Sequence, residues 1–274
     1  MAIGKRPDRG QSLSDAISWR HEGDGRFVAN VDPVWGQGRA VYGGIVGAGM
    51  ARAMAAAVSS DASLRSFSAT FAGPVQAGEI PCATELVREG RTASFMTAEI
   101  AQDGARRATA SAVFGAARES SAHTPGPALP DLPPPEACES MPYLDGLMPS
   151  FTQRVEYRYT HGAFPFMGGD GSRIGGWFRF RHDPEPGDGP GMLALIDTWP
   201  APALSGMKTP APASSITWSV DLFTHRLDAR LDQWWYFDAR TLFAVDGYTN
   251  FEASLWAPDG QYVARSSQLV GVFG

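Results

Sequence analysis

The pattern of apolar and polar positions in the first 120 residues predicts one helix among several strands. Residues 43–58, GGIVGAGMARAMAAAV, are almost all apolar or small and contain no Asp, Glu or His, which favours a buried helix. Apolar and polar residues alternate instead at 25–31 and 64–73, as they do in half-buried strands. Residues 81–115 also predict strands, joined at REGR and at QDGA, where the Asp-Gly pair is a strong hairpin signal. The predicted order is strand, helix and then a run of antiparallel strands.

The same order returns in the second half of the chain. Strands are predicted at 151–160, 172–182 and 214–223 and within 232–274. Residues 190–204 form an apolar segment in the position of the first helix, and Asp197 stands in the middle of it. Pro200 and Pro202 must end that helix early. A lone carboxylate in such a segment turns outward, caps a helix or takes part in chemistry.

A proline-rich stretch separates these two parts. Residues 124–135, TPGPALPDLPPP, contain six prolines and therefore form neither a helix nor a central strand. We interpret them as an extended connector. The predicted organisation is a first domain at 1–123, a linker at 124–149 and a second domain at 150–274 that carries the candidate active site.

The two parts also resemble one another. The hairpin AEIAQDGARRATASAV can be laid over SLWAPDGQYVARSSQLV, with Asp103 on Asp259 and Ala108 on Ala264. Such self-similarity indicates an internal duplication. A helix wrapped by an antiparallel sheet, made twice, is the double hotdog plan, an α+β fold. Two such sheets can pair edge to edge, which removes one exposed edge from each half.

The differences between the halves point to the second as the reactive one. The helix at 43–58 has no titratable acid, whereas its counterpart carries Asp197. The hairpin overlay puts Ala112 of the first half where Gln268 stands in the second. We interpret the pair Gly43–Gly44 as allowing close packing of a helix and a strand, with an oxyanion role as the alternative.

Composition narrows the class of partner. The 274 residues carry a net charge of −6 with 43% hydrophobic and 19% charged residues, as in a globular protein without a nucleic-acid footprint. No stretch approaches the roughly 18 apolar residues of a spanning helix, and the first twenty residues do not resemble a signal peptide. A cytoplasmic protein that binds no membrane is therefore expected. Cys82 and Cys138 form no disulfide framework or zinc site, and His161, His182 and His225 lack metal-ligand spacing, so neither metal nor cofactor is expected.

Four stretches, taken in order, resemble the acyl-CoA thioesterase II family, whose TesB-like members are double-hotdog thioesterases. They are VYGGIVGAGM at 41–50, SFSATFAGPVQAGE at 66–79, LVREGRTASFMTAEIAQDG at 86–104 and DGQYVARSSQLVGV at 259–272. In that family an Asp on the second helix, a Thr or Ser on the following strand and a Gln on the last strand hold the attacking water. The resemblance assigns these roles to Asp197, Ser215 and Gln268. Thr217, two residues further on, would share a strand face with Ser215 and is the alternative hydroxyl.

The resemblance implies hydrolysis of an acyl-CoA thioester to the free acid and CoA. An apolar setting raises the pKa of a carboxyl group, which suits Asp197 to general-base catalysis near neutral pH. Two alternatives are a non-catalytic acyl-CoA or lipid-binding protein and an enoyl-CoA hydratase, although a hydratase needs a His soon after the Asp and DTWPAPALSG has none. A dimer of double hotdogs is the expected assembly.

Overall fold

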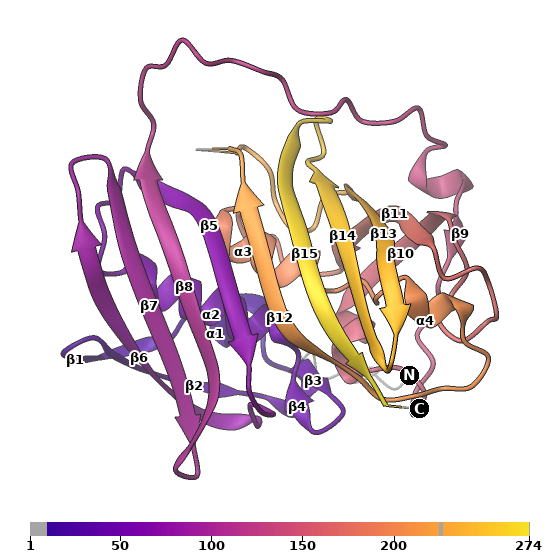
Figure 1. Ribbon diagram of the computed structural model, residues 1–274, viewed down its shortest axis with the longest axis horizontal. Helices are drawn as coiled ribbons and strands as arrows, with labels where there is room; N and C mark the ends of the chain where they lie inside the picture. Colours follow the sequence, from indigo (N-terminus) through magenta and orange to yellow (C-terminus); the bar gives the residue numbers. More distant parts are fainter. Residues whose placement is uncertain (1–9, 225–226, 274) are drawn as a thin grey trace, which may run out of the picture.

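The computed structural model describes residues 10–224 and 227–273, and within them thirteen strands form one continuous sheet (Figure 1). Its strand order is β1-β2-β6-β7-β8-β5-β12-β15-β14-β13-β11-β10-β9. The first half supplies β1 (Arg20–Gly23), β2 (Arg26–Val31), β5 (Ala62–Phe71), β6 (Gly78–Glu89), β7 (Ala93–Gln102) and β8 (Ala105–Ala116). The second half supplies β9 (Glu139–Ser140), β10 (Val155–His161), β11 (Arg173–Phe180), β12 (Ala213–Leu222), β13 (Trp235–Val245), β14 (Tyr248–Trp256) and β15 (Tyr262–Val272). A small ribbon of β3 (Gly36–Gln37) and β4 (Ala40–Val41) lies apart from this sheet.

The two halves meet where β5 pairs with β12 in antiparallel orientation. Thr70 stands opposite Thr217 at one end of this seam. At its other end Ser66 Oγ donates a hydrogen bond to Asp221 Oδ1 at 2.9 Å. The expected edge-to-edge pairing is confirmed, and it leaves neither inner edge open to another chain.

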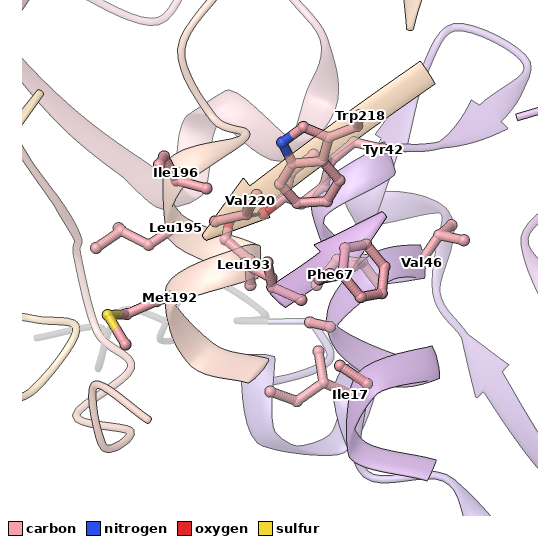
Figure 2. Close-up of a cluster of buried hydrophobic side chains, with 14 of the residues drawn as sticks. Ile17, Tyr42, Val46, Phe67, Met192, Leu193, Leu195, Ile196, Trp218 and Val220 are labelled. Atoms are coloured by element: carbon pink, nitrogen blue, oxygen red, sulfur yellow. Dashed lines mark hydrogen bonds between the residues drawn. The ribbon is translucent and has the colours of Figure 1, made fainter. Parts of the chain in front are cut away.

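One long helix from the first half packs against one from the second on the same side of the sheet. They are α2 (Gly43–Ala55), which ends three residues earlier than predicted, and α3 (Gly189–Ile196), and both are almost wholly buried. Figure 2 shows buried apolar side chains around the two helices, together with Phe67 of β5 and Trp218 of β12, whose ring centroids lie 5.6 Å apart in an edge-to-face arrangement. The short helices are α1 (Leu13–Ile17) and α4 (Ala203–Gly206). No helix within the described ranges is long and apolar enough to cross a membrane.

The early end predicted for the helix at 190–204 is confirmed. Asp197 is the C-cap of α3, and Pro200 and Pro202 follow after Thr198 and Trp199. Proline has no amide hydrogen to continue the helical ladder. The predicted strand at 151–160 is shorter than expected, because Ser150–Arg154 forms a 3-10 helix and β10 begins at Val155.

The strand registers of the two halves correspond to one another. Each of the two strands at the seam has a bulge: β5 has one extra residue, 65, relative to β8, and β12 has one extra residue, 216, relative to β15. The pairs on either side of these bulges are Leu64 with Phe114 and Phe67 with Ala112 in the first half, and Ser215 with Val270 and Trp218 with Gln268 in the second. Leu64 is therefore the counterpart of Ser215, and Ala112 is the counterpart of Gln268, as the sequence overlay predicts.

The connector crosses from the first half to the second as an extended segment, along the top of Figure 1. Residues 117–134 form neither helix nor strand. Two indole groups fasten it, since Trp256 Nε1 donates to the Pro127 carbonyl and Trp177 Nε1 donates to the Pro133 carbonyl, both at 3.0 Å. Residues 124–134 are extended as predicted, whereas Pro135 begins the 3-10 helix Pro135–Ala137. The domain boundaries at 123 and 150 stay a prediction because the sheet runs through both halves.

Candidate active site

A chain of hydrogen bonds joins the three side chains predicted to act together. Ser215 Oγ donates to Gln268 Oε1 at 2.7 Å, and Gln268 Nε2 donates to Asp197 Oδ1 at 2.7 Å. Ser215 lies on β12, Gln268 on β15 and Asp197 at the end of α3. Residues separated by up to 71 positions in the sequence are thus brought into one array.

The chemistry of the groups fixes the orientation of the central amide. An ionised carboxylate only accepts hydrogen bonds, so the NH2 of Gln268 must face Asp197 and its oxygen must face the Ser215 hydroxyl. Gln268 is 5% exposed, and its backbone carbonyl accepts a hydrogen bond from Asn250 Nδ2 at 2.8 Å. The amide is therefore held from both its side chain and its backbone.

The N-terminus of α2, which belongs to the other half, completes the site. Tyr42 precedes this helix and provides no side-chain cap for it. The Asp197 carboxyl takes that place and accepts a hydrogen bond from the Gly44 amide. A Cβ on Gly43 would lie 2.9 Å from Asp197 Oδ2, so only glycine leaves room for the carboxylate there. The site lies between the two halves.

Burial raises the pKa of Asp197 to about 7, although the residue keeps some accessible surface. Desolvation is the larger influence, because it disfavours the charged carboxylate. The hydrogen bonds from Gln268 and from the Gly44 amide act in the opposite direction and lower the pKa. The balance leaves a carboxyl group that exchanges its proton near neutral pH, as general-base catalysis requires.

Ser215 and Thr217 lie on opposite faces of β12, so the prediction that they share a face is wrong. The extra residue at 216 reverses the alternation, because a bulge adds one residue to a period of two. Ser215 is half-buried and points toward Gln268, whereas Thr217 is exposed and lines a hollow of about 930 Å³ on the other side of the sheet.

The residues of the array differ in how visible they are in the sequence. Asp197 stands out as an acid in an apolar segment, and Gln268 stands out against Ala112. The Gly43–Gly44 pair does allow close approach: a Cβ on Gly43 would meet the Phe71 ring of strand β5 at 3.3 Å as well as the Asp197 carboxylate at 2.9 Å. The sequence signal for the part that the α2 N-terminus plays is a pair of glycines at the start of a helix that has no capping side chain.

Metal ligands are not gathered at this site. In residues 10–224 and 227–273, no group of three or more His, Cys, Asp and Glu side chains is arranged to hold a metal ion. His225 lies outside these ranges. Cys82 and Cys138 are free thiols, and burial raises the pKa of Cys82 to about 12.

Family models match both halves of the chain. The acyl-CoA thioesterase N-terminal domain matches residues 31–115, and the acyl-CoA thioesterase C-terminal domain matches residues 135–272. The chain belongs to the acyl-CoA thioesterase family. The C-terminal match contains Asp197, Ser215 and Gln268, and the N-terminal match contains Gly43 and Gly44. The family assigns this chain to the thioester hydrolases.

Solved structures match this acyl-CoA thioesterase over almost its whole length. A conserved protein of unknown function with a hot dog fold from Alicyclobacillus acidocaldarius is 25% identical, with a TM-score of 0.84 over 96% of this chain and 98% of the other. A TesB protein from Mycobacterium avium subspecies paratuberculosis is 18% identical, with a TM-score of 0.79 over 96% and 100%. Acyl-CoA thioesterase II TesB2 from Mycobacterium marinum is 17% identical, with a TM-score of 0.74 over 96% and 99%. Comparison with curated protein sequences gives no match. The predicted α+β double hotdog fold is confirmed.

Proposed function

We propose that this thioesterase hydrolyses an acyl-CoA thioester through a water molecule held by Asp197, Ser215 and Gln268. The observation that carries the proposal is the hydrogen-bonded order Ser215–Gln268–Asp197 facing the N-terminus of α2. A base, a set of polar groups for one water and a group of backbone amides are what thioester hydrolysis needs.

In the proposed reaction, the Asp197 carboxylate removes a proton from the water as its oxygen attacks the thioester carbon. The carbonyl becomes an oxyanion, which the N-terminal end of α2 stabilises through its helix dipole and the backbone amide of Gly43. The Gly44 amide donates to Asp197, and the Ile45 amide donates to the Tyr42 carbonyl. The carbon–sulfur bond then breaks, and the proton on Asp197 passes to the departing sulfur. The products are the free acid and CoA thiol, and Asp197 is again ionised.

Ser215 and Gln268 orient the water in this scheme. The Ser215 hydroxyl donates to Gln268 and keeps lone pairs that accept from water. The Gln268 amide is anchored at both its ends, so the array is set before the substrate arrives. Such positioning supplies rate without a covalent enzyme intermediate.

Thiol release from a panel of acyl-CoA esters, short, long and aromatic, tests the proposal. Asp197→Asn should lower turnover by roughly 10²-fold or more. Asp188→Asn is the matched control, because it makes the same change at the other end of α3, where the carboxylate caps the helix and pairs with Arg52 at 2.9 Å.

The outcomes separate the candidate functions. Turnover that persists in Asp197→Asn would support thioester hydrolysis but would show that Asp197 is not the base. A wild-type protein that retains CoA esters without releasing thiol would be an acyl-CoA-binding protein. The dimeric assembly and the cytoplasmic location stay predictions, and light scattering after gel filtration tests the first.

A further inference from the structure

Two buried tyrosine hydroxyls hold the segment that carries Asp197. Tyr42 donates a hydrogen bond to the backbone carbonyl of Ala194. Tyr157 donates one to the backbone carbonyl of Thr198 at 2.9 Å. Tyr42 is 0% and Tyr157 is 1% exposed. The two bonds lie on either side of Asp197 in the chain.

These carbonyls need donors because α3 ends abruptly. The Thr198 amide, which would complete the ladder to Ala194, donates to Leu195 instead at 3.1 Å. Pro200 and Pro202 have no amide hydrogen to offer. The last carbonyls of a helix lack partners within the helix, and a buried carbonyl without a partner is costly. The tyrosine hydroxyls replace the missing amides.

We propose that Tyr42 and Tyr157 are positioning residues that fix the Asp197 carboxylate relative to Gln268 and the N-terminus of α2. The proposal rests on the function proposed above. Tyr42 directly precedes Gly43, so one residue connects the helix end that faces the substrate oxygen with the helix end that carries the base. Tyr157 holds the chain on the other side of Asp197.

The two hydroxyls are suited to this role because they stay protonated. Burial raises the pKa of Tyr42 and of Tyr157 well above the ordinary value, and the negative charge of Asp197 raises both further. Arg181 also acts on Tyr157, in the opposite direction. Both hydroxyls therefore remain donors while Asp197 gains and loses its proton.

The rings are held independently of their hydroxyl groups. Tyr42 stacks on Phe151 with ring centroids 4.1 Å apart, and it belongs to the buried apolar cluster that Figure 2 shows. Tyr157 meets the ring of Trp199 edge to face at 5.4 Å. Replacement by Phe retains this packing and removes one hydrogen bond, so it isolates the role of the hydroxyl.

The test compares Tyr42→Phe and Tyr157→Phe with the matched control Tyr159→Phe. Tyr159 is 5% exposed, and its hydroxyl has no hydrogen-bond partner among the residues that the structure describes. We expect kcat to fall about tenfold in each of the first two variants, with KM within twofold of wild type, and no such fall in the control. The midpoint of the acid limb of the pH profile should also shift to higher pH, because a displaced Asp197 carboxylate loses hydrogen bonds that lower its pKa.

A second readout does not depend on turnover. The ¹³C resonance of the Asp197 carboxyl reports its titration directly, and its midpoint should rise in Tyr42→Phe and Tyr157→Phe but not in Tyr159→Phe. Equal behaviour of all three variants in both measurements overturns the proposal, as does a loss of thermal stability with kcat and titration unchanged. Failure of the proposed function appears separately, as wild-type turnover that does not depend on Asp197.

Discussion

Replacing Asp197 by Asn should stabilise the folded protein at alkaline pH. In the folded protein burial raises the pKa of Asp197 to about 7, whereas an Asp in an unfolded chain has a pKa of about 3.9. Between these values the folded state binds more protons than the unfolded state, so stability falls as the pH rises. The stabilising effect of the protonated carboxyl is complete below about pH 4 and is lost as the pH rises through 7.

The size of this stability change follows from the difference in the Asp197 pKa between the folded and unfolded states. A difference of about 3 pKa units corresponds to about 4 kcal/mol across the whole range. Between pH 5 and pH 8 the same relation gives about 2.5 kcal/mol. The Asn side chain does not titrate, so the variant lacks this dependence. An Asn oxygen still accepts from Gln268, and the loss of one further hydrogen bond, about 1 kcal/mol, is the same at both pH values.

Urea unfolding at pH 5 and at pH 8, at one ionic strength, measures this difference. From the lower to the higher pH, the wild type should lose about 2.5 kcal/mol more of its free energy of unfolding than Asp197→Asn does. Subtracting the loss of the variant from the loss of the wild type cancels the contributions of the other titrating groups, which both proteins share. Equal losses in the two proteins would refute the reasoning, because they would mean that Asp197 titrates alike in the folded and unfolded states.

Three further predictions concern the array itself. The kcat/KM of the wild type should rise with pH to a plateau with a midpoint near 7, because Asp197 must be ionised to act as the base; a flat profile from pH 5 to 9 would contradict this. Ser215→Ala should lower kcat about tenfold through loss of one hydrogen bond, while Thr217→Ala, on the opposite face, should leave it within twofold. Gly43→Ala should lower kcat about tenfold or more, since its Cβ would meet the carboxylate at 2.9 Å and small displacements of reacting groups are costly. Gly73→Ala, whose Cβ would meet only a side chain at 3.4 Å, serves as the control.

The pattern of the sequence was sufficient to predict the two-part fold and two members of the array. Period-two alternation and the apolar segments define the strands and helices, and the duplication supplies an internal comparison. That comparison singled out Asp197 and Gln268 because each is polar where its counterpart segment is not. Edge-to-edge pairing of the two sheets followed from the need to close two open edges, whereas the strands that pair, β5 and β12, are known from the structure.

Other features depend on distant parts of the chain and have no local signal. The bulge at residue 216, which separates Ser215 from Thr217, arises from register against β15 and cannot be read from alternation alone. The approach of the α2 N-terminus to Asp197 depends on how the two helices pack across the seam. The hydrogen bond from Tyr157 joins residues 41 positions apart and likewise needs the folded sheet.

The tandem chain can give its two halves different tasks at positions that correspond. In a symmetric dimer of identical hotdogs, every substitution occurs twice, so a buried Ser and Gln at one site would be repeated at the other. Here the counterparts of Ser215 and Gln268 are Leu64 and Ala112, 3% exposed each, which pack as apolar core. The first half thus has apolar core packing at these positions, and the second half has the polar groups of the proposed reaction. Because the two copies are joined in one chain, a substitution in one half is not repeated in the other, and each half can be optimised separately.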